Sequence, residues 1–239
     1  MRPSISLVLP AYNEAENIEP MVAEAVPALE AVSDDFEIIV VDDGSADDTA
    51  AVTRQVMASN AHVRLVEHPV NRGFGAAVLT GFSSAEKDWI FYTDADRQFV
   101  LSELEHFVPL MEQADLIAGY RAPRRDPFLR VFYGKGWSML CTLVFGYTVR
   151  DVDCGFKLFR REIIEQLAPT IRSRGATFSI EWLARAKRAG YRFAELPVSH
   201  RPRVAGSQTG ANIGVIVRAF RELVQVRLQL WREGKPDRP

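Results

Sequence analysis

Two aspartates separated by one alanine follow an apolar stretch in the middle of the chain. Asp94 and Asp96 come directly after Trp89-Ile90-Phe91-Tyr92, in the segment FYTDADRQF. In an extended segment, side chains at positions i and i+2 point the same way, so both carboxylates can face one spot. Two neighbouring negative charges need compensation from a divalent cation, from an arginine or lysine, or from water. The pair is therefore a candidate metal site, and a solvated strand end is the alternative.

The elements that would position this pair are indicated by alternating patterns in the first 120 residues. The apolar runs ISLVLP, FEIIVVDD, VRLVEH, DWIFYTD and ADLIAGY are separated by helical patterns at about 15–32, 47–59, 75–84 and 102–113. This rhythm predicts an α/β fold with a mostly parallel, doubly wound sheet and helices on both faces. Ligands of such sheets bind beyond the carboxyl ends of the strands, and polar segments follow each apolar run here.

The second half of the sequence is less regular. Residues 121–130 are basic and contain prolines, which predicts a mobile loop, and the uncharged stretch 136–149 predicts a buried or interfacial helix. A strand and a helix start are expected within DVDCGFKLFRREII, a helix ending at Gly190, a strand in YRFAELPVSH, and a last helix from Asn212 to Arg232. We expect a catalytic domain over residues 1–210 and an amphipathic helix and tail over 211–239.

Composition excludes several classes of protein. The chain has 239 residues, 47% of them hydrophobic, and a net charge of −2, which does not indicate binding to nucleic acid. The two cysteines, Cys141 and Cys154, form no zinc-binding pattern. There is no signal-peptide pattern and no apolar run of membrane-spanning length. A reduced, cytoplasmic protein is therefore expected.

Common nucleotide and hydrolase motifs are missing. The first apolar run leads into Pro10-Ala11-Tyr12-Asn13-Glu14 rather than G-x-G-x-x-G, and there is no P-loop. The four histidines form no recognisable relay with a nucleophile.

Acidic strand ends suit a nucleoside diphosphate held through a metal. Mg²⁺ and Mn²⁺ prefer carboxylate and phosphate oxygens, which Asp94, Asp96 and a diphosphate can supply, and Gln98 can add an amide oxygen. Asp42 and Asp43 can accept hydrogen bonds from a base or a ribose, although DDGS is also a typical turn with a helix N-cap.

The segment NRGFG can place backbone amides near a phosphate. Gly73 and Gly75 stand where the third helical pattern begins, and helix N-termini favour anions. Taken alone, this motif is a weak signal.

Four motifs together resemble a known family. LVLPAYNEAENI, IIVVDDGSADDT, NRGFGAAV and TDADRQF are similar, in order and spacing, to segments of family-two glycosyltransferases of the GT-A fold. In the second half, GYR at 119–121, VRDVDCGFKLFRRE and IEWLARAKRAGYRFAELPV resemble dolichyl-phosphate mannose and glucose synthases and their polyprenyl-phosphate relatives. The resemblance covers nearly the whole chain.

The resemblance implies roles for individual residues. It implies a nucleotide pocket lined by Pro10, Tyr12, Glu14 and Asp42, a metal held by Asp94, Asp96 and Gln98, a lipid phosphate met by Arg121 and Arg130, and a late loop in which Arg203 closes on the diphosphate. Two positions depart from the pattern. Relatives commonly have Ser-Lys where this chain has Ser207-Gln208, a lost charge for which Arg201 is a candidate substitute, and Arg97 is unusual within the metal motif.

The implied activity is that of an inverting, Mg²⁺- or Mn²⁺-dependent enzyme. It would move a hexose from a GDP-mannose- or UDP-glucose-type donor to a polyprenyl or dolichyl phosphate. Two alternatives remain: a glycosyltransferase with a small-molecule, saccharide or protein acceptor, and a non-catalytic sugar-nucleotide binder. A lipid acceptor would require peripheral docking on the cytoplasmic face of a membrane. The last helix, with apolar residues and arginines at helical spacing, is the expected contact, and packing on the catalytic domain or on a second copy is the alternative.

Overall fold

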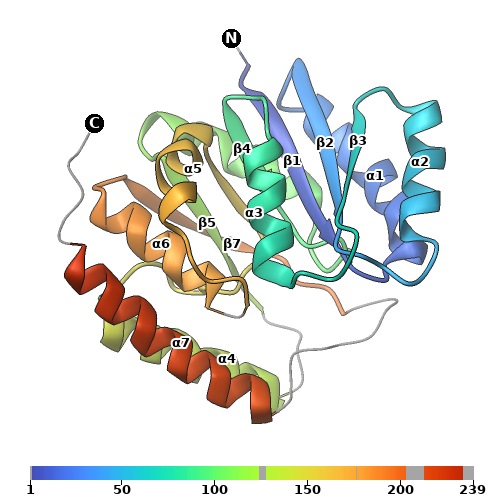
Figure 1. The fold of residues 1–239 in the computed structure, drawn as a ribbon. Helices are drawn as coiled ribbons and strands as arrows, with labels where there is room; N and C mark the ends of the chain where they lie inside the picture. Colours follow the sequence, from blue (N-terminus) through green and yellow to red (C-terminus); the bar gives the residue numbers. More distant parts are fainter. Residues whose placement is uncertain (1, 124–127, 176, 203–212, 234–239) are drawn as a thin grey trace.

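A single mixed sheet organises the chain in the computed structural model, which describes residues 2–123, 128–175, 177–202 and 213–233 (Figure 1). The strand order is β3-β2-β1-β4-β6-β5-β7. Only β6 runs antiparallel to its neighbours among these strands. The strands are β1 (Ser4–Ala11), β2 (Asp35–Asp42), β3 (Val63–Glu67), β4 (Trp89–Tyr92), β5 (Leu116–Arg121), β6 (Lys157–Arg160) and β7 (Phe193–Val198).

Helices cover both faces of this sheet, as the alternating pattern predicts (Figure 1). They are α1 (Ala15–Glu30), α2 (Thr49–Ser59), α3 (Phe74–Ser84), α4 (Phe128–Phe145), α5 (Arg161–Leu167), α6 (Phe178–Arg188) and α7 (Ile213–Arg232), with 3₁₀ turns η1 (Leu101–His106), η2 (Val108–Glu112) and η3 (Ala168–Thr170). Along β1, Leu7 and Leu9 pack on the side of α1, whereas Val8 packs on the side of α3. Burial on both faces explains the uninterrupted apolar run of this strand.

Two predicted segments differ from the structure. The helix expected at 102–113 is instead the pair of short 3₁₀ turns η1 and η2. Pro109 lies in the first turn of η2 and would remove a backbone donor from a continuous helix and clash with the preceding turn. The loop expected at 121–130 is shorter, because Arg121 ends β5 and Arg130 lies within α4.

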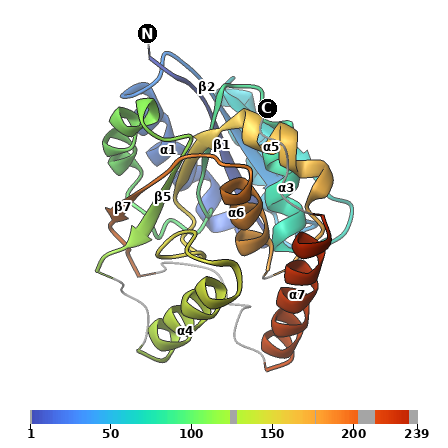
Figure 2. The ribbon, with the colours of Figure 1, turned by 90° about the vertical axis from the view of Figure 1, so that its left-hand side faces the viewer.

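Helices α4 and α7 lie beyond the carboxyl ends of the strands (Figure 1). Figure 2 shows them standing apart at this end of the molecule, with α4 below β5 and α7 beside α6. Three apolar side chains of α7, Leu223, Val226 and Leu230, are buried against the rest of the protein. Another stripe points outward and consists of Val224, Leu228 and Trp231, with exposed fractions of 57%, 48% and 73%.

The outer side of α4 is also apolar. Met139 and Leu143 are 65% and 76% exposed, and Tyr147, just after the helix, is 55% exposed. Within the described residues, no helix combines the length and the hydrophobicity needed to cross a membrane.

Candidate active site

The two aspartates of the metal motif are oriented by hydrogen bonds from the protein. The hydroxyl of Tyr92, the last residue of β4, donates to Asp94 Oδ1 at 2.9 Å. The backbone N–H of Gln98 donates to Asp96 Oδ1 at 3.2 Å. Burial and the charge of Asp94 raise the pKa of Tyr92 well above its usual value, so this hydroxyl keeps its proton and acts as a donor.

Residues from the loop before β6 complete the surroundings of Asp94. A Cβ added to Gly155 would lie 2.3 Å from Asp94 Oδ2, so the backbone of the loop itself abuts the carboxylate. In the antiparallel pairing of β4 with β6, Tyr92 lies opposite Lys157. Sequence reasoning assigned no role to Gly155 or Lys157, although a lysine in an apolar strand was a usable signal.

The residues of the metal motif fit a divalent cation that is shared with a ligand. Two carboxylates are a typical partial ligand set for Mg²⁺ or Mn²⁺, which take their other ligands from phosphate oxygens and water. The described residues contain no group of three or more His, Cys, Asp or Glu side chains arranged to hold a metal by themselves. Gln98 is buried, and its side-chain amide donates to the carbonyl of Arg201 at 3.1 Å, so its predicted metal contact would come from its oxygen.

The predicted nucleotide pocket lies where β1 and β2 end side by side. Ala11 pairs with Asp42 in the parallel register, so the ends of the two strands coincide. Asp42 is buried, and its Oδ1 accepts the backbone N–H of Ser45 at 3.0 Å. Tyr12 remains 42% exposed and presents an aromatic ring at this edge. Glu14 accepts the Asn17 amide at 2.6 Å.

The loops that follow β1 and β2 are also joined to each other. The backbone amides of Asn13, Glu14 and Ala15 donate to Ser45, Thr49 and Asp47, respectively. The backbone at the edge of the predicted pocket, for which Pro10, Tyr12, Glu14 and Asp42 are the expected lining, is therefore preorganised.

The carboxylate of Asp43 contacts other residues of the protein. Its Oδ1 contacts His68 Nδ1 at 2.6 Å and accepts the N–H of Arg72, while its Oδ2 accepts the N–H of Gly73 at 2.9 Å. Asp43 therefore positions the loop that leads into α3. The ligand contacts predicted for Asp43 and Gly73 stay predictions, and a phosphate would have to displace this carboxylate to reach the Gly73 amide.

The arginine predicted to meet an acceptor phosphate is held by a buried carboxylate. Arg121 Nε and Nη2 donate to Asp151 Oδ2 and Oδ1 at 2.7 and 2.8 Å, and the two side chains are only 7% and 13% exposed. Burial alone would lower the pKa of Arg121, but its hydrogen bonds to Asp151 and the charge of that carboxylate raise it above its usual value. Sequence reasoning missed Asp151, which lies 30 residues away in sequence.

A second arginine lies beside this pair. The Arg150 guanidinium lies over the ring of Tyr120, 4.2 Å from its centroid, at the end of β5. Arg150 is exposed, so it presents positive charge next to the compensated Arg121–Asp151 pair. The side chain of Arg130 and all of Arg203, Ser207 and Gln208 lie outside the described residues.

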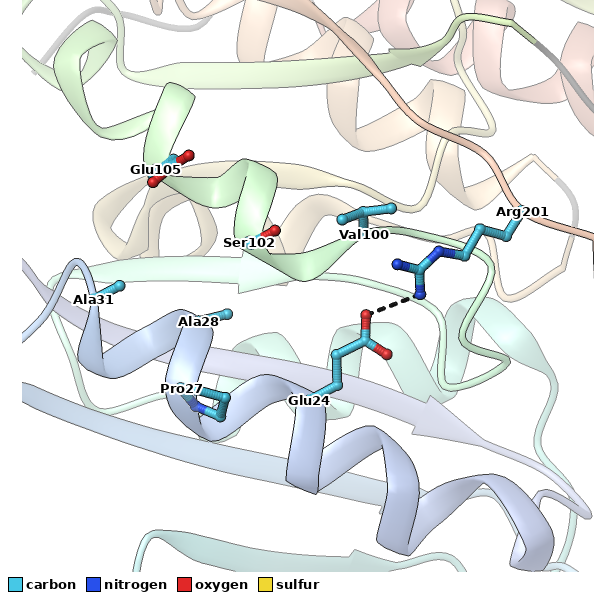
Figure 3. A pocket seen from close by; sticks show the side chains of 8 residues that line it. All are labelled: Glu24, Pro27, Ala28, Ala31, Val100, Ser102, Glu105 and Arg201. Atoms are coloured by element: carbon cyan, nitrogen blue, oxygen red, sulfur yellow. Dashed lines mark hydrogen bonds and ion pairs between the residues drawn. The ribbon is translucent and has the colours of Figure 1, made fainter.

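Arg201, the candidate substitute for the lost charge, points toward α1. Its Nη1 lies 3.2 Å from Glu24 Oε1, across a pocket of about 290 Å³ between α1 and η1 (Figure 3). Its backbone N–H donates to the Gln98 carbonyl at 2.7 Å. The segment that follows β7 is thus hydrogen-bonded to Gln98 of the metal motif, whereas the Arg201 guanidinium pairs with Glu24 of α1.

The loop between η3 and α6 connects the start of α3 with α7. The carbonyl of Arg174 accepts the N–H of Gly75 in α3 at 2.9 Å. Thr177 Oγ1 donates to Glu222 Oε2 of α7 at 2.7 Å. This loop therefore contacts both α3, on the predicted donor side, and α7.

Comparison with known proteins gives one family. The sequence profile of glycosyl transferase family 2 matches residues 6–168. The dolichyl-phosphate beta-glucosyltransferase ALG5C of Trichomonas vaginalis is 33% identical, over 98% of this chain and 75% of its own length. An undecaprenyl-phosphate 4-deoxy-4-formamido-L-arabinose transferase of Photorhabdus laumondii is 30% identical over 68% of this chain, which corresponds to 51% of that protein. The chain thus spans most of the first relative and about half of the second.

Solved structures confirm the type of fold. Glucosyl-3-phosphoglycerate synthase from Mycobacterium tuberculosis, in complex with Mn²⁺, uridine diphosphate and phosphoglyceric acid, superposes with a TM-score of 0.69. The match covers 98% of this chain and 80% of that structure, at 22% sequence identity.

Proposed function

We propose that this chain, which belongs to glycosyl transferase family 2, glycosylates polyprenyl phosphate. Its membership in this family confirms the family expected from its motifs. The donor would be a nucleoside-diphosphate hexose, and the reaction would take place at a membrane surface. The GT-A fold and the assignment as a glycosyltransferase are established by the family and the fold. The observation that carries the proposal is that the paired carboxylates follow β4 at its carboxyl end, the end of the sheet beyond which α4 and α7 lie with their outward apolar stripes (Figure 1).

On the donor side, the nucleoside would lie at the joined ends of β1 and β2. Tyr12, Glu14 and Asp42 would contact it, and Asp94 and Asp96 would hold Mg²⁺ or Mn²⁺ on the diphosphate. That cation would neutralise charge that grows on the departing nucleoside diphosphate. The fixed orientations of both aspartates support this role, because preorganised groups need no rearrangement during the reaction.

On the acceptor side, the corner formed by the end of β5 and the loop before β6 would bind the lipid phosphate. Arg150 offers an exposed guanidinium there, already held over Tyr120. Arg121, which Asp151 holds through its Nε and Nη2, would add a second positive charge beside it. Arginine suits this task because it binds phosphate bidentately.

The proposed reaction is a direct displacement. An oxygen of the lipid monophosphate attacks the anomeric carbon, and the bond from that carbon to the nucleoside diphosphate breaks, which inverts the anomeric centre. The acceptor is already an anion, so no protein base has to remove a proton. No protein nucleophile is needed, consistent with the missing relay motif.

Peripheral docking would bring the lipid to the site. The outward stripes of α4 (Met139, Leu143) and α7 (Val224, Leu228, Trp231) would enter the interfacial region of the bilayer. Arg221, Arg227 and Arg232 are exposed on α7 and would add attraction to anionic lipid, at roughly 1 kcal/mol each. The names of two relatives, a dolichyl-phosphate beta-glucosyltransferase and an undecaprenyl-phosphate sugar transferase, support a lipid phosphate as the acceptor. Docking would take place on the cytoplasmic face of the membrane.

A transfer assay tests the proposal. The protein is incubated with Mn²⁺, polyprenyl phosphate and a panel of radiolabelled donors that includes UDP-glucose and GDP-mannose, and the products are extracted into organic solvent. We expect label in the organic phase for one donor class, none in the presence of chelator, and a loss on the order of 10²–10³ in rate for Asp96→Ala. Label that stays in the aqueous phase on an added sugar or phosphorylated small molecule would instead identify a water-soluble acceptor.

A further inference from the structure

A charged side chain is fully enclosed next to the predicted metal site. Lys157 is 1% exposed. Its Nζ donates to the carbonyl of Val152 at 3.1 Å and to the carbonyl of Cys154, and lies 5.9 Å from the centre of the Tyr92 ring. A buried ammonium is costly unless its donors are satisfied, so the fold retains this lysine against a penalty that an apolar residue would not incur.

The acidic residues around the site compensate this charge. Burial lowers the pKa of Lys157, whereas the nearby carboxylates of Asp151, Asp153 and Asp94 oppose that effect. The ammonium thus lies between the metal motif and the loop that carries Asp151, the partner of the acceptor-side arginine.

Two groups that contact Asp94 are also linked to Lys157. Tyr92, which donates its hydroxyl to Asp94, is the partner of Lys157 across the β4–β6 pairing. Gly155, whose backbone abuts the Asp94 carboxylate, directly follows Cys154, whose carbonyl accepts a hydrogen bond from Lys157. The carboxylate therefore contacts the Tyr92 hydroxyl on one side and, on the other, the loop whose carbonyls the Lys157 ammonium binds.

We propose that Lys157 is a positioning residue, which holds the loop from Val152 to Gly155 against Asp94 and so fixes this carboxylate for the divalent cation. The inference rests on the proposed function in one respect, because it takes Asp94 as a metal ligand. Lysine suits the position because its compact ammonium has three donors, which here reach the carbonyls of Val152 and Cys154.

The test measures Mn²⁺ binding by the electron paramagnetic resonance signal of the free ion, first with Mn²⁺ alone and then with UDP or GDP present. Lys157→Met keeps the volume and removes the donors, and we expect its Mn²⁺ affinity to fall at least tenfold. Lys87→Met is the matched control, since Lys87 pairs with Asp35 at the opposite end of the strands. It should bind Mn²⁺ as the wild type does.

The Gly155→Ala variant reports on the same contact without touching the lysine. Its added Cβ meets Asp94 Oδ2, so we expect a comparable loss, and the double variant Lys157→Met/Gly155→Ala should be no weaker than the worse single variant. A lysine that served stability alone would lower the melting temperature of Lys157→Met and leave Mn²⁺ affinity intact.

Three outcomes separate the two proposals. If wild-type protein binds Mn²⁺ and folded Lys157→Met binds it equally well, the role of Lys157 is wrong and the proposed function stands. If Lys157→Met does not fold, wild-type affinity in folded Gly155→Ala overturns the role instead. If the wild type does not bind Mn²⁺ with either nucleotide, the metal-dependent function fails first.

Discussion

Arg97 adopts a strained backbone conformation within the metal motif. Its φ is +59°, a conformation that costs a non-glycine residue of this size about 1 kcal/mol or more. Its Nε is buried and has no partner among the described residues. We expect Arg97→Asn, which tolerates this φ, to raise the free energy of unfolding by about 1 kcal/mol in urea titrations, since asparagine visits this region more readily.

The same variant should be a poorer enzyme. Strain retained at a site is a reason to look for function there, and the substitution removes a positive charge one residue away from Asp96. We expect slower transfer at saturating donor and acceptor. A variant that is more stable and equally active would show that the strain at residue 97 serves no catalytic purpose.

The two cysteine thiols should make the protein sensitive to alkali. Burial raises the pKa of Cys141 and of Cys154 to about 12, whereas an unfolded thiol ionises near pH 8.5. The folded state then keeps protons that the unfolded chain loses, so stability is fully present below about pH 8.5 and falls as pH rises toward 12. The slope is roughly 1.4 kcal/mol per pH unit for each thiol.

Urea unfolding of the double variant Cys141→Ala/Cys154→Ala checks this slope. Between pH 8 and 10 its stability should decline less steeply than that of the wild type, and the comparison cancels the titration of lysines and tyrosines. Equal slopes would contradict the burial of these thiols as the cause.

At the residue scale, the sequence predicts those members of the candidate site that are close to each other along the chain. It misses the members that only the fold brings near them. The spacing of Asp94 and Asp96 is local, and so is the turn that follows Asp42. Gly155 and Lys157 reach Asp94 only because β6 inserts between β4 and β5, and no local pattern gives that register. The contact between Asp43 and His68 depends in the same way on the pairing of β2 with β3, because His68 directly follows β3.

Among the elements, the start of α3 packs so closely on α6 that it requires glycine. A Cβ on Gly75 would lie 2.6 Å from Phe178 Cβ and 2.9 Å from the carbonyl group of Arg174. We therefore expect Gly75→Ala to lower the free energy of unfolding by about 1–3 kcal/mol and to raise the donor KM, because the loop that leads into α3 has to move.

The control for this substitution is Gly136→Ala in α4, where an added Cβ meets nothing within 4 Å. Alanine is the better helix former by roughly 0.5–1 kcal/mol, so the free energy of unfolding of this variant, measured in the same way, should be unchanged or slightly higher. Equal effects of both substitutions would mean that close packing is not what Gly75 provides.

Strands and long helices follow from the sequence more reliably than short irregular elements. The five apolar runs of the first half correspond to β1–β5, and those of β1, β2 and β4 are nearly uninterrupted because both faces of these strands are buried. The sequence predicts one helix where the structure has η1 and η2, because Leu101, Leu104, Phe107 and Met111 recur at helix-like intervals, whereas Pro109 interrupts a continuous helix. The separation of residues 211–239 from the catalytic domain stays a prediction, although α7 buries Leu223 in the main core.

For the whole molecule, docking on a bilayer should depend on the outward stripes of α4 and α7. We expect the protein to float with anionic vesicles, more weakly at high salt because surface charges are screened. Leu143→Glu and Trp231→Glu should each reduce binding at least tenfold, since burial of such a side chain contributes about 1.5–3 kcal/mol. Met57→Glu, which changes an apolar residue of α2 that is 37% exposed, should bind as the wild type does.

Point substitutions suit this test better than removal of α7, because that helix also buries Leu223, Val226 and Leu230. Protein that stays in the soluble fraction at low salt would contradict peripheral docking and favour a water-soluble acceptor.

The position of β6 also sets the order in which the chain can fold. Residues up to Tyr92 contain β1 to β4, which pair consecutively in space as β3-β2-β1-β4, so they can form a parallel half-sheet as they leave the ribosome. β5 pairs with β6 and β7 rather than with β4, so the second half joins the first only when β6 enters antiparallel between them. Until then β4 has an open edge, which is prone to wrong pairing. The nascent protein therefore carries Asp94 and Asp96, the predicted metal ligands, before Gly155 can abut Asp94, and the surroundings of the predicted site are completed in the same event that closes the sheet.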